Sequence, residues 1–136
     1  MKSALLFTAF CIAFCMMPML SVAQAKTVLP DTRLNSLFDA DYLQRLQSLQ
    51  PVQLERLNYY LDHSFEVQTL ASTKTSEGLP EVVIPDITAF NIVAFEREHH
   101  LFRNAESPQI FHIKNTNQIL VLLSEKEFVK RFNAAR

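Results

Sequence analysis

The chain has 136 residues, 49% of them hydrophobic, and its 13 basic and 14 acidic residues give a formal net charge of −1 at pH 7. Binding to nucleic acid or to an anionic membrane needs a clustered excess of basic residues, so this charge balance argues against both. A single glycine excludes a phosphate-binding loop rich in glycine. It also favours a compact module over an enzyme with mobile lids.

Residues 1–25 have the pattern of a secretory signal peptide. Lys2 forms the positive start, an apolar stretch follows, and 23–25 reads Ala-Gln-Ala, a small-x-small cleavage site. An uncleaved membrane anchor is the alternative, because the apolar run approaches the length of a spanning helix. Pro18 and the cleavage site favour cleavage. We therefore expect an exported protein, periplasmic or secreted, without a membrane partner after cleavage, and the short positive segment suits a bacterial source.

Cleavage leaves 111 residues, enough for one domain with a modest core. Both cysteines, Cys11 and Cys15, leave with the signal, so the mature chain has no disulfide, thiol nucleophile or thiolate metal site. Lys2 is the only charge lost, which leaves 12 basic and 14 acidic residues and a net charge of −2. We expect residues 26–38 to form a flexible lead-in and residues 39–136 a single domain.

Two helices are predicted over residues 40–49 and 51–62, because apolar residues recur there at helical spacing. Asp39 or Asp41 can cap the first helix. Pro51 is unfavourable inside a helix but favourable in the first turn of a new one. A single helix kinked at this proline is the alternative.

Three strands are predicted next. Residues 65–70 alternate between apolar and polar side chains. Residues 81–84 form a short strand between Pro80 and Pro85, which suits the edge of a sheet because proline cannot extend the ladder. Residues 90–97 are predicted to be a further strand.

The C-terminal end predicts a hairpin followed by a helix. Residues 110–114 and 118–123 read as strands, and the turn residues 115–117 lie between them. The second strand contains five consecutive apolar residues, as in a strand buried on both faces. Ser124 and Glu127 have the spacing of a capping box. The helix that follows has one apolar face, which we expect to pack on the hairpin.

This order of elements predicts an α+β fold. Neighbouring strands joined by loops imply a mainly antiparallel sheet, and four to five strands fit a domain of this size. We expect the two N-terminal helices and the C-terminal helix to pack on one face of the sheet.

The sequence contains one cluster of potential metal ligands, and its members are Glu96, Glu98, His99, His100 and the more distant His112. Histidine and carboxylate groups can hold zinc. In a strand, however, adjacent histidines point to opposite faces, and no HExxH spacing is present. We therefore assign no metal ligand, catalytic residue or cofactor site, and keep a small metal-dependent hydrolase at Glu96–His100 with His112 as the alternative function.

Other catalytic patterns are weak. No serine lies in a Gly-x-Ser-x-Gly motif. His63 stands between Asp62 and Ser64, but the side chains of sequence neighbours diverge, which disfavours a triad. Tyr59 and Tyr60 are typical of core residues whose polar tips reach the surface.

The interpretation that these observations favour is a small, exported, non-catalytic binding or accessory module. It would act through a sheet face or strand edge, on another exported or envelope protein or on itself. A pocket between helices and sheet for an apolar ligand, lined by Tyr59, Tyr60 and Phe95, is a third interpretation.

Overall fold

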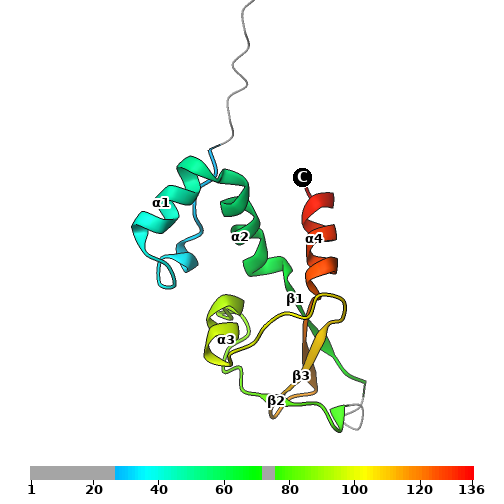
Figure 1. The fold of residues 1–136 in the computed structure, drawn as a ribbon. Coiled ribbons are helices and arrows are strands. Elements are labelled where there is room, and N and C mark those ends of the chain that lie inside the picture. The colour runs from blue at the N-terminus through cyan, green and yellow to red at the C-terminus, as the bar shows by residue number, and fades with distance from the viewer. Residues whose placement is uncertain (1–26, 72–75) are drawn as a thin grey trace, which may run out of the picture.

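A computed structural model describes residues 27–71 and 76–136, and in this part of the chain four helices and one mixed four-stranded sheet form an α+β fold (Figure 1). The predicted fold class and single small domain are confirmed, whereas the expected signal peptide lies outside the described residues. None of the described helices has the length and apolar character needed to cross a membrane. The elements are η1 (Thr32–Leu34), α1 (Ala40–Leu49), α2 (Pro51–His63), β1 (Phe65–Thr69), β2 (Glu81–Val82), α3 (Ile92–Glu98), β3 (Gln109–Ile113), β4 (Gln118–Leu122) and α4 (Glu125–Ala134).

The first two helices are separate, as predicted. Pro51 occupies the first turn of α2, where its missing N–H costs no helical hydrogen bond. Leu43 and Leu46 of α1 and Leu54 and Leu61 of α2 are buried in one core. The apolar spacing of both helices therefore fixes the faces that meet.

The sheet has the strand order β1-β4-β3-β2. β4 pairs antiparallel with both β1 and β3, and β2 pairs in parallel with β3. The predicted hairpin joins β3 to β4, and Asn115 supplies the left-handed residue of its turn, with a φ of 62°. The predicted edge strand between the two prolines is β2, and β1 forms the opposite edge.

The central strand β4 is buried on both faces, as its uninterrupted apolar run predicts. Leu120 and Leu122 share one face with Phe65, which lies opposite Leu122 in the register. Ile119 and Val121 lie on the other face, and both are buried.

The prediction of a strand over residues 90–97 is wrong, because this segment forms helix α3. The side-chain oxygen of Asn91 accepts hydrogen bonds from the N–H groups of Val93 at 3.1 Å and Ala94 at 3.2 Å, which caps the helix. Ile92 and Phe95 are buried at helical spacing. The four consecutive apolar residues 92–95 fit a short buried strand as well as a helix, but the cap and the packing against Phe111 select the helix.

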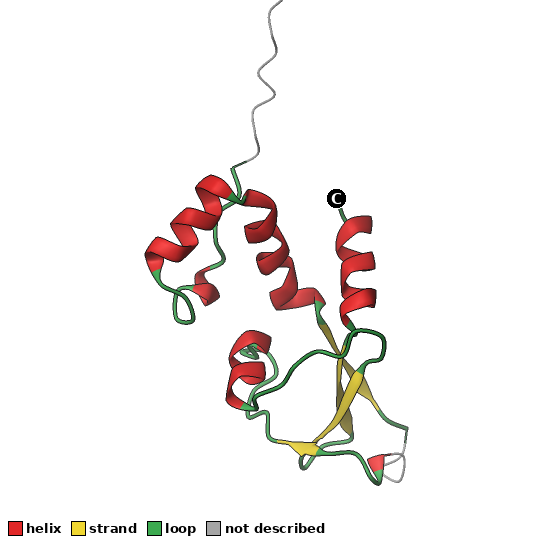
Figure 2. Ribbon diagram, in the orientation of Figure 1, coloured by secondary structure: helices red, strands yellow, loops and turns green. Residues whose placement is uncertain are grey.

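The C-terminal helix α4 packs against α2, although the hairpin was expected as its main partner (Figure 2). Ser124 caps it as predicted by accepting from the N–H of Glu127 at 3.2 Å. The ring of Phe128 lies 5.0 Å from that of Tyr60, and the ring of Phe132 lies 5.5 Å from that of Tyr59. The apolar face of α4 therefore packs on aromatic side chains of α2, and this contact lies beyond the end of the sheet.

Residues 27–38, the described part of the expected lead-in, contact the body of the domain. Leu34, within η1, is fully buried in the core. Arg33 binds Asp31 at 2.8 Å and Asp62 of α2 at 2.7 Å, so it connects this segment to the second helix. The weak periodicity of this segment did not indicate these contacts.

Candidate functional site

The expected cluster of metal ligands does not assemble. Glu96 points to Tyr60, the His99 ring lies 4.4 Å from that of Phe95, and the His112 Nε2 lies 2.9 Å from the carbonyl oxygen of Thr116. Among the described residues, no three histidine, cysteine or acidic side chains are placed to hold a metal. The geometry therefore gives the hydrolase alternative no support.

The sequence neighbours Asp62, His63 and Ser64 also diverge. Asp62 binds Arg33, the His63 ring stacks on that of Tyr59 at 4.1 Å, and the Ser64 hydroxyl is buried inside the protein. These three side chains do not form a triad.

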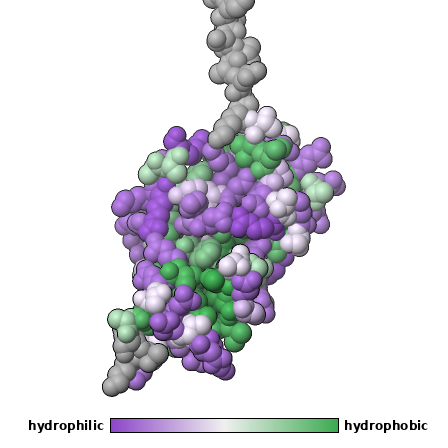
Figure 3. All heavy atoms as spheres, turned by 180° about the vertical axis from the view of Figure 1, so that it is seen from behind, coloured by the Kyte–Doolittle hydropathy of each residue, from purple (hydrophilic) through white to green (hydrophobic). Residues whose placement is uncertain are grey.

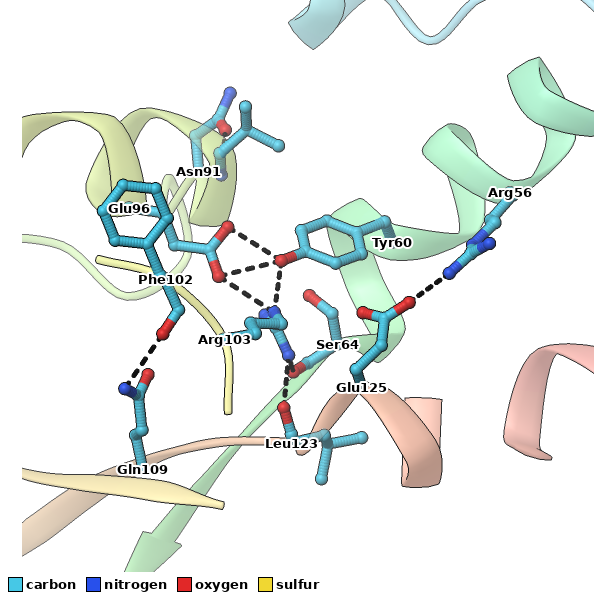
Figure 4. A network of polar contacts seen from close by, with 11 residues as sticks. Arg56, Tyr60, Ser64, Asn91, Glu96, Phe102, Arg103, Gln109, Leu123 and Glu125 are labelled. Carbon is cyan, nitrogen blue, oxygen red and sulfur yellow. Dashed lines mark hydrogen bonds and ion pairs between the residues drawn. The ribbon is translucent and has the colours of Figure 1, made fainter. Parts of the chain in front are cut away.

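A buried polar network centres on Arg103, in the connection between α3 and β3 (Figure 4). Its Nε donates to Oε1 of Glu96 at 2.9 Å and also contacts the Tyr60 hydroxyl. Its Nη1 donates to the carbonyl oxygens of Ser64 at 2.6 Å and Leu123 at 2.8 Å. One side chain thereby connects α2, α3 and the end of β4.

Burial makes this network electrostatically strong. The side chains of Arg103 and Glu96 are 7% and 15% exposed, and the effective dielectric constant is low in such surroundings. The pKa of Tyr60 is raised well above its usual range, first by burial and then by the charge of Glu96. The phenol therefore stays protonated at neutral pH and donates to the carboxylate at 2.8 Å. The arrangement is that of a structural lock between elements.

Sequence reasoning missed Arg103, because it lies between the segments predicted as strands, 90–97 and 110–114, and outside every motif. The only signals are the flanking Leu101, which is partly buried against the core, and Tyr60, whose polar tip needs a partner.

A groove of about 360 Å³ opens between the helices beside this lock. Its charged groups pair within the protein, since Arg56 binds Glu125 and Glu96 binds Tyr60. The groove consequently selects for no particular ligand charge. Of the three residues expected to line an apolar pocket, only Tyr60 does so. Its lining consists of Tyr42, Leu46, Gln50, Gln53, Arg56, Leu57, Tyr60, Val93, Glu96, Glu125 and Phe128.

The outer edge of β1 carries unpaired backbone groups. The N–H of Leu70 donates to the Asn117 carbonyl at 2.7 Å, and the N–H of Leu123 donates to the Ser64 carbonyl at 3.0 Å. Even-numbered residues therefore face β4, and the N–H and C=O groups of Val67 and Thr69 point outward. Within the described parts of the chain, nothing bonds to these groups.

The opposite edge is shorter and is interrupted by prolines. β2 pairs over only Glu81 and Val82. The N–H groups of His112 and Lys114 donate to the carbonyls of Pro80 at 2.8 Å and Val82 at 2.9 Å. The backbone of Val83 consequently points away from β3. Prolines on both sides limit any extension of the ladder at this edge.

The charge on β1 is already compensated. Glu66 lies 2.7 Å from Nη1 of Arg131 of α4, and it also accepts from Nε2 of Gln68 at 3.1 Å. The Arg131 guanidinium, and then the Gln68 amide, hold the pKa of the Glu66 carboxyl below its usual range. An approaching strand therefore meets a Glu66 carboxylate that is ionised and whose charge is balanced by Arg131.

Comparisons with models of protein families, with curated proteins and with solved structures gave no match.

Proposed function

We propose that this protein is a small exported, non-catalytic binding module that adds an extended segment to its sheet, either from another exported or envelope protein or from a second copy of itself. The open edge of β1 carries the proposal. Main-chain hydrogen bonds to an exposed strand supply affinity in this mode of recognition, and side chains on alternate residues supply specificity.

The two edges of the sheet differ in length and in proline content, so that only one of them is suited to pair with an added strand. β1 offers five residues, Phe65–Thr69, without a proline, lysine or glycine. β2 offers two residues beside Pro80 and Pro85. Natural proteins protect exposed edges with short strands, prolines and charges, and β1 has only one charge, which Arg131 neutralises.

Exposed apolar residues around the sheet also favour a protein partner. On the face shown in Figure 3, apolar side chains gather in the lower half, where the sheet lies, whereas the upper half of this face is mostly hydrophilic. The exposed large hydrophobic residues of the sheet and its connections are Val83, Ile87, Phe102 and Ile110. The N-terminal segment and the first two helices expose Leu29, Tyr42, Leu49 and Val52.

A proline substitution tests the edge while leaving the ladder inside the sheet intact. Val67→Pro removes an outward N–H, which β4 does not use. Val83→Pro is the matched control, because it removes an outward N–H from the opposite edge. The mature chain is used to select binders from a displayed library of short extended peptides, and binding is measured by calorimetry.

We expect selected peptides to bind the native chain and the Val83→Pro variant with similar affinity. Binding to the Val67→Pro variant should fall by at least about tenfold, because one ladder hydrogen bond and the local strand geometry are lost. Equal binding of the peptides to both variants would overturn the proposal. Hydrogen exchange of the complex locates the contact, and protection of amides outside β1 by the selected peptides would also overturn it.

A further inference from the structure

The outward groups of β1 are complementary to those of a second copy of the same strand. The backbone N–H and C=O groups of Phe65, Val67 and Thr69 point away from β4. Outward pairs of hydrogen-bonding groups therefore recur at every second residue of β1. If Val67 is placed opposite Val67 of an antiparallel copy, Phe65 lies opposite Thr69. All five residues then overlap, and each of the three outward pairs exchanges two hydrogen bonds.

The side chains agree with this register. Glu66 comes to lie opposite Gln68 of the second copy, where the amide can donate to the carboxylate. The same two groups already meet at 3.1 Å within one chain. On the opposite face of the sheet, Val67 meets Val67, a pair of β-branched side chains that suits a strand.

Neighbouring registers are less favourable. A shift of two residues in one direction places Glu66 opposite Glu66, which is destabilising for like charges directly across a ladder. A shift in the other direction places Gln68 opposite Gln68. Either shift reduces the overlap from five residues to three within Phe65–Thr69.

Charge compensation removes the remaining obstacle to this pairing. In the favoured register the two Glu66 side chains lie diagonally on one face, and each is bound by Arg131 of its own chain at 2.7 Å. Glu127 holds the same guanidinium at 3.0 Å, so the cation stays beside the strand.

We propose that two copies of this protein pair antiparallel through β1 about a two-fold axis at Val67, an inference that depends on the function proposed above for this edge. The two four-stranded sheets then join into one continuous sheet, in which β1 of one copy lies beside β1 of the other. The self-complementary register selects a second copy over an unrelated strand.

Cysteine substitutions test the register directly, because the mature chain beginning at Lys26 contains no native cysteine. Residues 66 and 68 of the two copies form a pair without mutual hydrogen bonds, whose Cα atoms are about 4.5 Å apart, within the range of a disulfide. Two copies of residue 66, or two of residue 68, are diagonal and about 8 Å apart, beyond that range.

Glu66→Cys and Gln68→Cys chains are therefore oxidised separately and as an equal mixture. We expect the mixed disulfide to exceed either symmetric one by at least about fivefold, because only the mixed pair has the required geometry. Adding Val67→Pro to both chains should abolish this preference, whereas Val83→Pro should preserve it.

Equal yields of all three disulfides would overturn the register. Absence of the mixed disulfide, together with a purely monomeric native chain in sedimentation at submillimolar concentration, would overturn self-pairing itself. Peptide binding at β1 by that monomer would still leave the proposed function standing, so the two failures are distinguishable. If Val67→Pro fails to fold by circular dichroism, the relative yields of the cysteine pairs decide the question alone.

Discussion

The Nε of Arg103 lies 2.9 Å from Oε1 of Glu96, and both side chains are almost completely buried. These residues are only seven positions apart, yet the same arginine also binds carbonyl oxygens of Ser64 and Leu123. The pair therefore fixes α2, α3 and the start of α4 relative to the sheet. The β1 edge begins directly after Ser64, so this lock also positions the proposed binding strand.

Removing one partner of this ion pair should destabilise the fold strongly. Glu96→Leu leaves the buried Arg103 charge uncompensated, and we expect the free energy of unfolding to fall by about 3–5 kcal/mol in urea denaturation. The double variant Glu96→Leu/Arg103→Met should cost less than the sum of the single variants, because the charges are removed together.

An exposed ion pair serves as the control for this prediction. Lys126 binds Glu106 at 2.9 Å, and both side chains are 73% exposed. Lys126→Ala should change the free energy of unfolding by less than about 0.5 kcal/mol. A loss below about 1 kcal/mol for Glu96→Leu would show that the pair does not lock the fold.

The cap of α3 gives a second prediction about stability. Asn91→Ala removes two hydrogen bonds to the first turn, and we expect a loss of about 1 kcal/mol in the free energy of unfolding. Asp39→Ala is a matched control, because Asp39 occupies the cap position of α1 without a side-chain hydrogen bond to that helix. A cost for Asp39→Ala as large as that for Asn91→Ala would contradict this assignment.

Stability should decrease in acid through the carboxylates around Arg33. The Arg33 guanidinium bonds Asp31 and Asp62 and holds the pKa of each below its usual range. A carboxyl whose pKa is lowered by folding stabilises the protein above its unfolded pKa, and this contribution is lost as the pH falls below about 4. Chemical denaturation from pH 7 to pH 3 should show the decrease.

The variant Arg33→Met isolates this contribution. Without the guanidinium, both carboxyl groups return toward their ordinary pKa values, so the dependence of stability on pH below about 4 should become shallower. An unchanged slope would show that these ion pairs do not differ between the folded and unfolded states.

Export should remove the first 25 residues. Expression of the full chain in a bacterium should yield a periplasmic or secreted protein whose mass and N-terminal sequence begin at Lys26. Ala25→Arg changes the small residue at the cleavage site and should leave the precursor uncleaved. Recovery of the native full-length chain in the exported fraction would contradict cleavage, whereas recovery only inside the cell would contradict export.

The sequence predicts an element correctly where its local signals, such as caps, turn residues and prolines, agree with the packing of the whole chain. Pro51 separates two helices, Asn115 turns the hairpin and Ser124 caps the last helix, as their side-chain chemistry indicates. Residues 92–95 are four consecutive apolar residues, a run too short for periodicity to distinguish a helix from a strand. Only the bonds of the Asn91 side chain and the contact with Phe111 decide between helix and strand.

Long-range pairing was beyond sequence reasoning. Nothing local to Arg103 indicates that Glu96, Ser64 and Leu123 converge on it. The partner of α4 was also missed, since an apolar helical face shows that it needs a partner but not which one. The sequence also did not show that β1 is an edge strand, because the strand order β1-β4-β3-β2 is set by the packing of the whole chain.

Hydrogen exchange at single residues tests the central claim, that β1 is the binding edge, most directly. In dilute monomer, the amides of Glu66 and Gln68, which face β4, should be protected, whereas those of Val67 and Thr69 should exchange rapidly. On raising the protein concentration, or on adding a selected peptide, Val67 and Thr69 should become protected. If self-association or peptide binding leaves the exchange of both amides unchanged, the contact lies elsewhere and the account is wrong.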